Sequence, residues 1–234
     1  NVGATRVLLV GLGNEKSMSS AKYADIARTV IGKMKATSFR TNLCCLLEVD
    51  VPGRSIEWKT QKIVESFEAG LYSFTEMKGK PPVNTVSIES VDLLLDDKSE
   101  LETVLNGIAV GNALTAGISS AKTLGNLPGN ICTPTYLANQ AKQLAKDYSS
   151  ITTKVIEEKE IEKLGMGAFM SVTRGSVQPG KLIVITHKGG KAKEAPHVLV
   201  GKGITFDTGG ISLKPGGGMH EMIWDMCGAA SVFG

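Results

Sequence analysis

This sequence has few cysteines and histidines, and their spacing supports neither a disulfide framework nor a histidine metal motif. The four cysteines include no C-x-x-C pair, and Cys44 and Cys45 are adjacent, a pattern typical of reduced cytosolic thiols rather than of a disulfide framework. The three histidines form no H-E-x-x-H metal motif, and no G-x-S-x-G segment provides a serine nucleophile.

Charge and hydropathy exclude further classes of protein. A net charge of +3 is too small to indicate nucleic acid or an anionic membrane as a partner. No apolar run approaches the roughly 18 residues of a membrane span, so we expect a cytoplasmic protein without a membrane partner. A hydrophobic share of 42% and a charged share of 21% exclude general disorder.

The length of 234 residues, at roughly 150 per domain, predicts one or two domains. The chain begins at Asn1 with neither a methionine nor a basic leader, so we expect it to be part of a longer protein.

The first 98 residues alternate between strand-like and helix-like patterns. Apolar runs at residues 6–12 and 43–51 predict buried strands, and Val86 and Ile88 mark a shorter one. Two groups of apolar residues recur at helical spacing: Tyr23, Ile26, Ala27, Val30 and Met34, and then Ile63, Val64, Phe67 and Leu71. We therefore expect a small N-terminal α/β domain over residues 1–98, incomplete at its start.

A long apolar helix is predicted over residues 99–124, and Gly125 and Pro128 provide its stop signals. We assign residues 99–125 as a connector helix between two domains. The helix after it begins cleanly, because Thr133 can cap free amides and Pro134 has no N–H to satisfy.

Residues 126–234 form the second predicted domain, incomplete at its end. Strands at residues 152–156, 182–186 and 198–200 alternate with helices, which favours a mostly parallel sheet flanked by helices. Ligands bind beyond the carboxyl ends of the strands in such sheets. The strand at 198–200 leads directly into the segment GKGITFDTGG, where we expect the site.

The C-terminal segment combines dense glycine with isolated charges, since residues 201–234 hold 9 of the 27 glycines. Charged groups in such apolar surroundings must be paired, neutralised or metal-bound. Asp207 and Asp225 offer hard oxygen ligands for Mn²⁺, Mg²⁺ or Zn²⁺. Lys214 is a candidate fixed cation for a developing oxyanion, and Lys202 could be another or a neutral amine ligand.

The residues around Asp225 fit an amphipathic α-helix. One face carries five apolar residues: Met219, Met222, Ile223, Met226 and Ala230. At about 100° per residue, Asp225 lies about 120° from the centre of that face, so it points toward the glycine-rich loop. The spacing is also compatible with an exposed helix carboxylate at Asp225 and a solvated loop lysine at Lys214.

A weaker motif, GLGNEK, begins at Gly11 after a predicted strand and before a predicted helix. Gly11 and Gly13 fit a dinucleotide fingerprint, but Lys16 replaces the third glycine. A tight strand-to-helix turn explains the segment as well. A nucleotide-binding α/β protein is the rival interpretation, and it predicts nucleotide binding without added metal.

The segments GKGITFDTGGISLKP and DMCGAA resemble the leucyl (cytosol) aminopeptidase family, hexameric exopeptidases with two metal ions. TLGNLPGNICTPTYLA at residues 123–138 is similar to the start of that family's catalytic domain. The resemblance implies an α/β fold: a small N-terminal domain, a connector helix, and the first part of a mixed-sheet aminopeptidase domain.

The resemblance also implies roles for individual residues. Lys202 would bind one metal, Asp207 would bridge both, and Asp225 would complete one of the two sites. Lys214 matches the family's catalytic lysine, and Met222 resembles a side chain that lines the pocket for the substrate's first residue. All five residues would therefore contact substrate or metal. Thr208, where many members have serine, should leave the metal site intact.

One family segment, N-T-D-A-E-G-R-L, does not occur in the sequence. It supplies a further Asp and Glu to the metals and a second catalytic arginine. Three of the five expected ligand residues are therefore present, and we expect this chain alone to be inactive and to bind metal weakly.

The function implied by the resemblance is release of N-terminal amino acids, preferably neutral and leucine-like, from peptides. The implied cofactors are two divalent ions per subunit, Mn or Zn, and the implied assembly is a homo-hexamer in the cytoplasm. An alternative is a non-catalytic or additional DNA-binding role of the same fold, which the small net charge does little to support.

Overall fold

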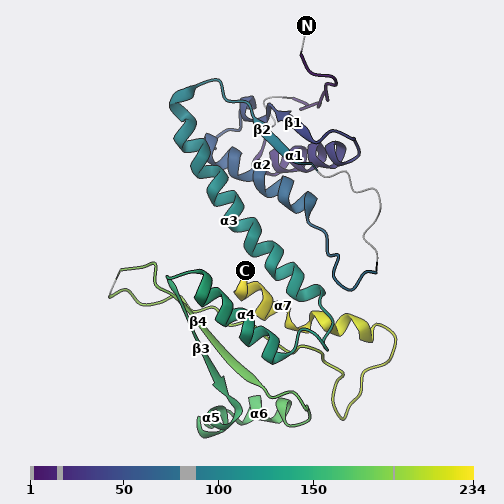
Figure 1. Cartoon of the computed structure of the whole chain (residues 1–234), viewed down its shortest axis with the longest axis vertical. Helices are drawn as coiled ribbons and strands as arrows, with labels where there is room; N and C mark the ends of the chain where they lie inside the picture. Colours follow the sequence, from purple (N-terminus) through teal and green to yellow (C-terminus); the bar gives the residue numbers. More distant parts are fainter. Residues whose placement is uncertain (1–2, 15–17, 80–87, 192) are drawn as a thin grey trace. The chain divides into compact units, whose positions relative to one another are not determined.

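The computed structural model describes residues 3–14, 18–79, 88–191 and 193–234. The chain forms two compact units, Asn1–Ser119 and Ser120–Gly234, whose boundary lies inside helix α3 (Leu101–Asn126). Figure 1 shows the order of helices and strands along the chain. The domain limits at residues 98 and 125 stay predictions. The mixed α/β class expected from the sequence is confirmed.

Two amphipathic helices supply the core of the first unit: α1 (Ser20–Lys35) and α2 (Ile56–Leu71). Every member of the predicted α1 stripe is buried: Tyr23, Ile26, Ala27, Val30 and Met34. From α2, Ile63 and Phe67 join the same apolar cluster. The helical periodicity in the sequence therefore identified the core-facing residues correctly.

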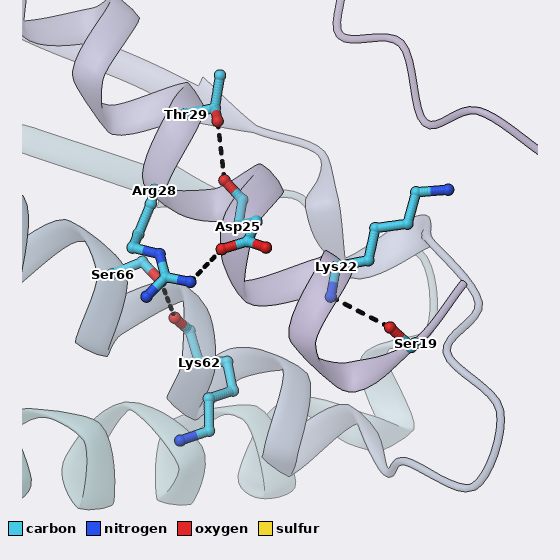
Figure 2. Close-up of polar contacts among 7 residues, drawn as sticks. All are labelled: Ser19, Lys22, Asp25, Arg28, Thr29, Lys62 and Ser66. Carbon is cyan, nitrogen blue, oxygen red and sulfur yellow. Dashed lines mark hydrogen bonds and ion pairs between the residues drawn. The ribbon is translucent and has the colours of Figure 1, made fainter. Parts of the chain in front are cut away.

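Serine side chains begin both helices. The backbone N–H of Lys22 donates to Oγ of Ser19 at 3.3 Å, which satisfies one of the free amides of α1 (Figure 2). Figure 2 also shows an ion pair between Arg28 and Asp25 on the exposed face of α1. Because both side chains are exposed, this pair adds little stability. The hydroxyl of Ser66 in α2 donates to the carbonyl of Lys62 at 2.7 Å.

Strands β1 (Thr41–Cys44) and β2 (Ser90–Leu93) pair in parallel, with Thr41 opposite Ser90 and Cys44 opposite Leu93. The short 3₁₀ helices η2 (Leu46–Glu48) and η3 (Lys98–Glu100) follow at their carboxyl ends. The parallel arrangement places both carboxyl ends at one edge of the pair.

The expected strand at residues 6–12 is wrong. These residues are described but form no strand, and Leu9 is 89% exposed, although Val10 and Leu12 pack partly against the core. A strand exists only through backbone pairing, and an apolar run by itself does not provide a partner. Val86, part of the shorter predicted strand, and Lys16, part of the GLGNEK motif, lie outside the described residues.

Helix α3 packs closely on α2 through glycines. A side chain added at Gly107 would place its Cβ 2.7 Å from the carbonyl oxygen of Glu57, and one at Gly111 would meet Val64 at 2.8 Å. The stretch Lys98–Asn126, which includes the turn before α3, has a mean hydropathy of 1.2. By length and composition alone, it could cross a membrane. Core helices of soluble proteins pass the same criterion, so the feature is weak support for a membrane.

In the second unit, α4 (Pro134–Asp147) follows the end of α3. Oγ1 of Thr133 accepts from the N–H of Tyr136 at 3.2 Å, as the predicted N-cap of this helix. Strands β3 (Ile151–Glu157) and β4 (Lys181–His187) follow, with α5 (Glu158–Lys163) and α6 (Gly167–Thr173) between them. A small apolar cluster of Ile156, Ile161 and Met170 holds this part together.

Two sequence expectations for this unit are wrong. β3 and β4 pair antiparallel, with Ile151 opposite His187, rather than parallel, and alternation of elements could not distinguish the two. Residues 198–200 form no strand and are exposed. The chain ends in η4 (Met219–Met226) and α7 (Cys227–Phe233).

Candidate functional site

Close backbone packing fixes the start of the glycine-rich segment against α7. The N–H of Ala229 donates to the carbonyl of Lys202 at 2.8 Å. A Cβ at Gly201 would lie 2.4 Å from the carbonyl oxygen of Gly228, and one at Gly228 would lie 2.9 Å from the nitrogen of Lys202. Glycine is therefore required on both sides of this contact, which brings Lys202 beside the end of η4.

The loop between Asp207 and Lys214 closes on itself. The N–H of Lys214 donates to the carbonyl of Thr208 at 2.9 Å. Gly209 has φ of 93°, and a Cβ there would lie 2.5 Å from the carbonyl oxygen of Ser212. Only glycine meets both conditions without strain, so the Gly-Gly pair in the sequence is what returns Lys214 to Asp207.

Lysine–aspartate contacts link the charged residues in two pairs. Nζ of Lys202 lies 2.5 Å from Oδ1 of Asp225, and Nζ of Lys214 lies 3.1 Å from Oδ2 of Asp207. Lys214 Nζ is also 3.0 Å from Sδ of Met222. The structure thus brings together all five site residues predicted from the sequence.

Three neighbours hold the carboxylate of Asp207 ionised. Its Oδ1 accepts from the N–H of Gly209 at 2.9 Å. The pKa of Asp207 is lowered to about 2. The largest cause is this backbone hydrogen bond, followed by the Lys214 ammonium and then by the side chain of Asp225. The role of Asp225 in this shift shows that the two carboxyl groups are neighbours.

Asp225 contains an unsatisfied oxygen. Its side chain is 24% exposed, but Oδ2 is buried and accepts from no donor within the described part of the chain. A buried carboxylate oxygen without a partner is costly and calls for a proton, a water or a cation. Oδ2 is therefore the atom of this site that most requires an additional ligand.

The donor set fits a divalent ion. Two neighbouring carboxyl groups and one amine provide hard oxygen and nitrogen ligands, and a cation would be the partner that Oδ2 of Asp225 lacks. Within residues 3–14, 18–79, 88–191 and 193–234, no group of three or more His, Cys, Asp or Glu side chains could hold a metal. Lys202 would thus be needed to complete a set of three.

The local helix differs from the one expected. Met219–Met226 forms a 3₁₀ helix, and only Cys227–Phe233 is α-helical, so the apolar face calculated at about 100° per residue is wrong for this segment. Asp225 nonetheless points to Lys202. Lys214 is 36% exposed and contacts two side chains, which disfavours its interpretation as a solvated loop lysine.

Sequence reasoning missed the backbone part of the site. The N–H of Gly209 and the carbonyl of Thr208 hold Asp207 and Lys214 in place. The density of glycine in the sequence indicated a tightly turned loop. It did not indicate which backbone groups of the loop would contact Asp207 and Lys214.

Comparison with known families gives two matches along the chain. The profile of the cytosol aminopeptidase family, N-terminal domain, matches residues 1–81. The profile of the cytosol aminopeptidase family, catalytic domain, matches residues 119–234, which include all five site residues.

Individual proteins agree with these matches. A probable cytosol aminopeptidase of Methylobacillus flagellatus is 48% identical over 233 residues, which are 100% of this chain and 47% of that protein. A cytosol aminopeptidase of Vibrio cholerae is 46% identical over 98% of this chain and 46% of its own length. The chain therefore spans about half the length of the curated relatives it matches.

Among solved structures, bottromycin maturation enzyme BotP in complex with Mn superposes with a TM-score of 0.77 at 28% identity. The match covers 96% of this chain and 45% of that one. The same enzyme, described without Mn, matches with a TM-score of 0.75.

Proposed function

The chain belongs to the cytosol aminopeptidase family, and from this premise we propose that the protein of which it is part removes N-terminal amino acids from peptides in a metal-dependent reaction. The observation that carries the proposal is the cluster of Lys202, Asp207, Lys214 and Asp225, with its buried, unpartnered Oδ2. The whole cluster lies inside the region matched by the catalytic-domain profile.

We assign metal binding to Lys202, Asp207 and Asp225. Two divalent ions, Mn or Zn, would polarise the scissile carbonyl and supply an activated water when bound. The Mn in the BotP structure supports this choice of metal class. The amine of Lys202 must be unprotonated to coordinate, so its contact with Asp225 would be exchanged for a bond to the ion.

Lys214 acts on the substrate rather than on the metal in this proposal. Its ammonium is held by Asp207 and lies against Met222, at the border between the charged cluster and an apolar side chain. A fixed cation in that position stabilises the oxyanion that develops as the peptide carbonyl is attacked. The proton of Lys214 stays on Nζ throughout.

Met222 suggests the substrate preference. Its sulfur lies 3.0 Å from Lys214 Nζ, so a substrate carbonyl near Lys214 would place its first side chain close to Met222. Thioether side chains adapt to apolar groups of varied shape. We therefore propose a preference for neutral, leucine-like N-terminal residues.

The remaining proposals concern the setting of the reaction. We propose peptides as the substrates and the cytoplasm as the compartment, in keeping with the names of the relatives. The proposed assembly is a homo-hexamer, which rests on the resemblance of the sequence to the family. The net charge of +3 gives DNA binding little electrostatic support, so it is not part of the proposal.

The test is hydrolysis of leucine amide by the full-length protein, before and after exhaustive chelation. We expect chelation to abolish activity and Mn²⁺ or Zn²⁺ to restore it. The 234-residue chain alone should be inactive, because it covers less than half of each curated relative quoted above. Activity that survives complete metal removal would overturn the proposal.

A further inference from the structure

A buried turn in the second unit continues from the last residues of α3. Residues 125–132, which we call the supporting turn, include Leu127 and Cys132, each 1% exposed. The N–H groups of Ile131 and Cys132 both donate to the carbonyl of Pro128 at 2.9 Å, and α4 begins directly after the turn. Buried segments with paired backbone groups resist local opening, so this turn can hold other segments in position.

Gly129 of the supporting turn lies against the main chain just before Asp207. A Cβ at Gly129 would lie 2.9 Å from Cβ of Phe206 and 3.0 Å from the carbonyl oxygen of Thr205. Neither atom can swing aside as the end of a long side chain could, because one is a backbone atom and the other is bonded to the backbone. Phe206 directly precedes Asp207, so this contact fixes where the main chain enters Asp207.

The same turn contacts the segment that carries Asp225. A Cβ at Gly125 would lie 3.0 Å from Sγ of Cys227. The N–H of Cys227 donates to the carbonyl of Trp224, the residue before Asp225. Burial and, secondarily, Cys227 raise the pKa of Cys132 to about 11, so the two thiols are neighbours. The supporting turn therefore contacts both of the segments that carry the carboxyl groups.

These contacts lie closer to the carboxyl groups than the hydrogen bond that joins the two segments directly. That bond, from the N–H of Ala229 to the carbonyl of Lys202, lies five residues before Asp207 and four after Asp225. The supporting turn meets the same segments one residue before Asp207 and two residues after Asp225. It therefore bears more directly on the separation of the two carboxyl groups.

We propose that the supporting turn sets the separation of Asp207 and Asp225 for metal binding, with Gly129 and Gly125 as positioning residues. The inference rests on the proposed metal centre, and it adds two residues that contact neither metal nor substrate. Distances to the ligands of a metal site hold to within about 0.2 Å. In Gly129→Ala, Phe206 would have to move by about 0.5 Å, from 2.9 Å to an ordinary contact of 3.4 Å, which exceeds that tolerance.

The test is calorimetric titration of the metal-free, full-length protein with Mn²⁺, with circular dichroism to show that each variant is folded. We expect Gly129→Ala to weaken Mn²⁺ binding about tenfold or more, as changes behind metal ligands commonly do. Gly167→Ala is the matched control. It changes a helical glycine of the same unit whose added Cβ would have no atom within 4 Å, so it should bind Mn²⁺ as the wild type does.

A second set of variants separates positioning from a general loss of stability. Gly125→Ala should weaken Mn²⁺ binding by a smaller factor, because the thiol of Cys227 can turn partly away from the new Cβ. Cys227→Ala removes the sulfur that this Cβ meets, so the double variant Gly125→Ala/Cys227→Ala should recover the wild-type affinity. A purely structural turn would lower the thermal stability of the metal-free protein without this loss and recovery of Mn²⁺ affinity.

The outcomes separate this inference from the proposed function. If the wild type binds Mn²⁺ and folded Gly129→Ala binds it equally well, the positioning role is wrong and the proposed metal centre stands. If Gly129→Ala does not fold, the other variants decide, and the absence of recovery in the double variant overturns the inference. A wild type that binds neither Mn²⁺ nor Zn²⁺ would overturn both proposals.

Discussion

The ammonium of Lys202 lies 2.5 Å from Oδ1 of Asp225. The contact depends on the hydrogen bond from Ala229 to the Lys202 carbonyl and on the glycines that let the two backbones meet. It joins two residues to which we assign metal binding. A charged ammonium can hold this carboxylate, but only a neutral amine can coordinate an ion beside it. We therefore propose that Lys202 binds metal as a neutral amine, whereas Lys214 stays charged.

The first prediction concerns Lys202 in the full-length protein. Lys202→Ala should lower both the bound metal and the rate of hydrolysis, because it removes a ligand. Lys202→Arg should fail in the same way, since arginine does not give up its proton to coordinate. Elemental analysis after dialysis measures the metal. Full metal occupancy in Lys202→Arg would show that Lys202 is not a ligand.

The second prediction concerns Lys214. Lys214→Ala should leave the metal content nearly unchanged and reduce kcat by about 10²-fold, as expected for loss of an oxyanion-stabilising group. Lys214→Arg should keep part of the activity, because it keeps the charge. Loss of metal in Lys214→Ala would mean that the roles of the two lysines should be exchanged.

The third prediction concerns Tyr23, which is fully buried and donates through its hydroxyl to the carbonyl of Leu46 at 3.0 Å. Tyr23→Phe should lower the free energy of unfolding by about 1–2 kcal/mol, because that carbonyl loses its donor. Urea unfolding followed by the fluorescence of Trp58, whose ring lies 5.9 Å from that of Tyr23, measures the change. Tyr148→Phe, at an exposed position, should have no effect and is the control.

The buried hydroxyl of Tyr23 also makes the stability of the protein depend on pH. Burial, and secondarily Cys44, raise the pKa of Tyr23 above its ordinary value. The unfolded phenol ionises near pH ~10, before the folded one, so the stabilisation from Tyr23 is complete below that pH and is lost above it. The stability of the wild type should therefore fall more steeply above pH ~10 than that of Tyr23→Phe. Parallel curves would contradict the assignment.

The fourth prediction compares two helical glycines. Gly107→Ala should destabilise the first unit, because the new Cβ would lie 2.7 Å from the backbone carbonyl of Glu57, which cannot move easily. Gly32→Ala, in α1 with no atom within 4 Å, should instead stabilise it by about 0.5–1 kcal/mol. Thermal unfolding of both variants provides the comparison. A stabilising Gly107→Ala would show that α2 and α3 are not in close contact there.

Helices were the elements most readily predicted from the sequence. The stripe from Tyr23 to Met34 and the capping pair Thr133–Pro134 are local signals, and both are confirmed. The apolar runs at 6–12 and 198–200 gave wrong strands, because a strand depends on a distant partner that local pattern does not identify. The antiparallel pairing of β3 and β4 was missed for the same reason.

The candidate site was predictable in its residues but not in its geometry. Asp207 and Asp225 stood out as charges among glycines, and the structure places their carboxyl groups together. Which lysine faces which aspartate could not be inferred from spacing, since it depends on the loop closed by Gly209 and on the backbone contact at Gly201. The 3₁₀ form of Met219–Met226 has no clear sequence signal either.

The measurement that tests the central claim most directly is the metal content per chain of the full-length protein and its Asp225→Asn variant. Asp147→Asn, an exposed aspartate at the end of α4, is the matched control. We predict two divalent ions per chain in the wild type and in Asp147→Asn, and a clear loss in Asp225→Asn, whose unpartnered oxygen would become an amide. Equal metal content in all three proteins would contradict the assignment of this cluster as the metal centre.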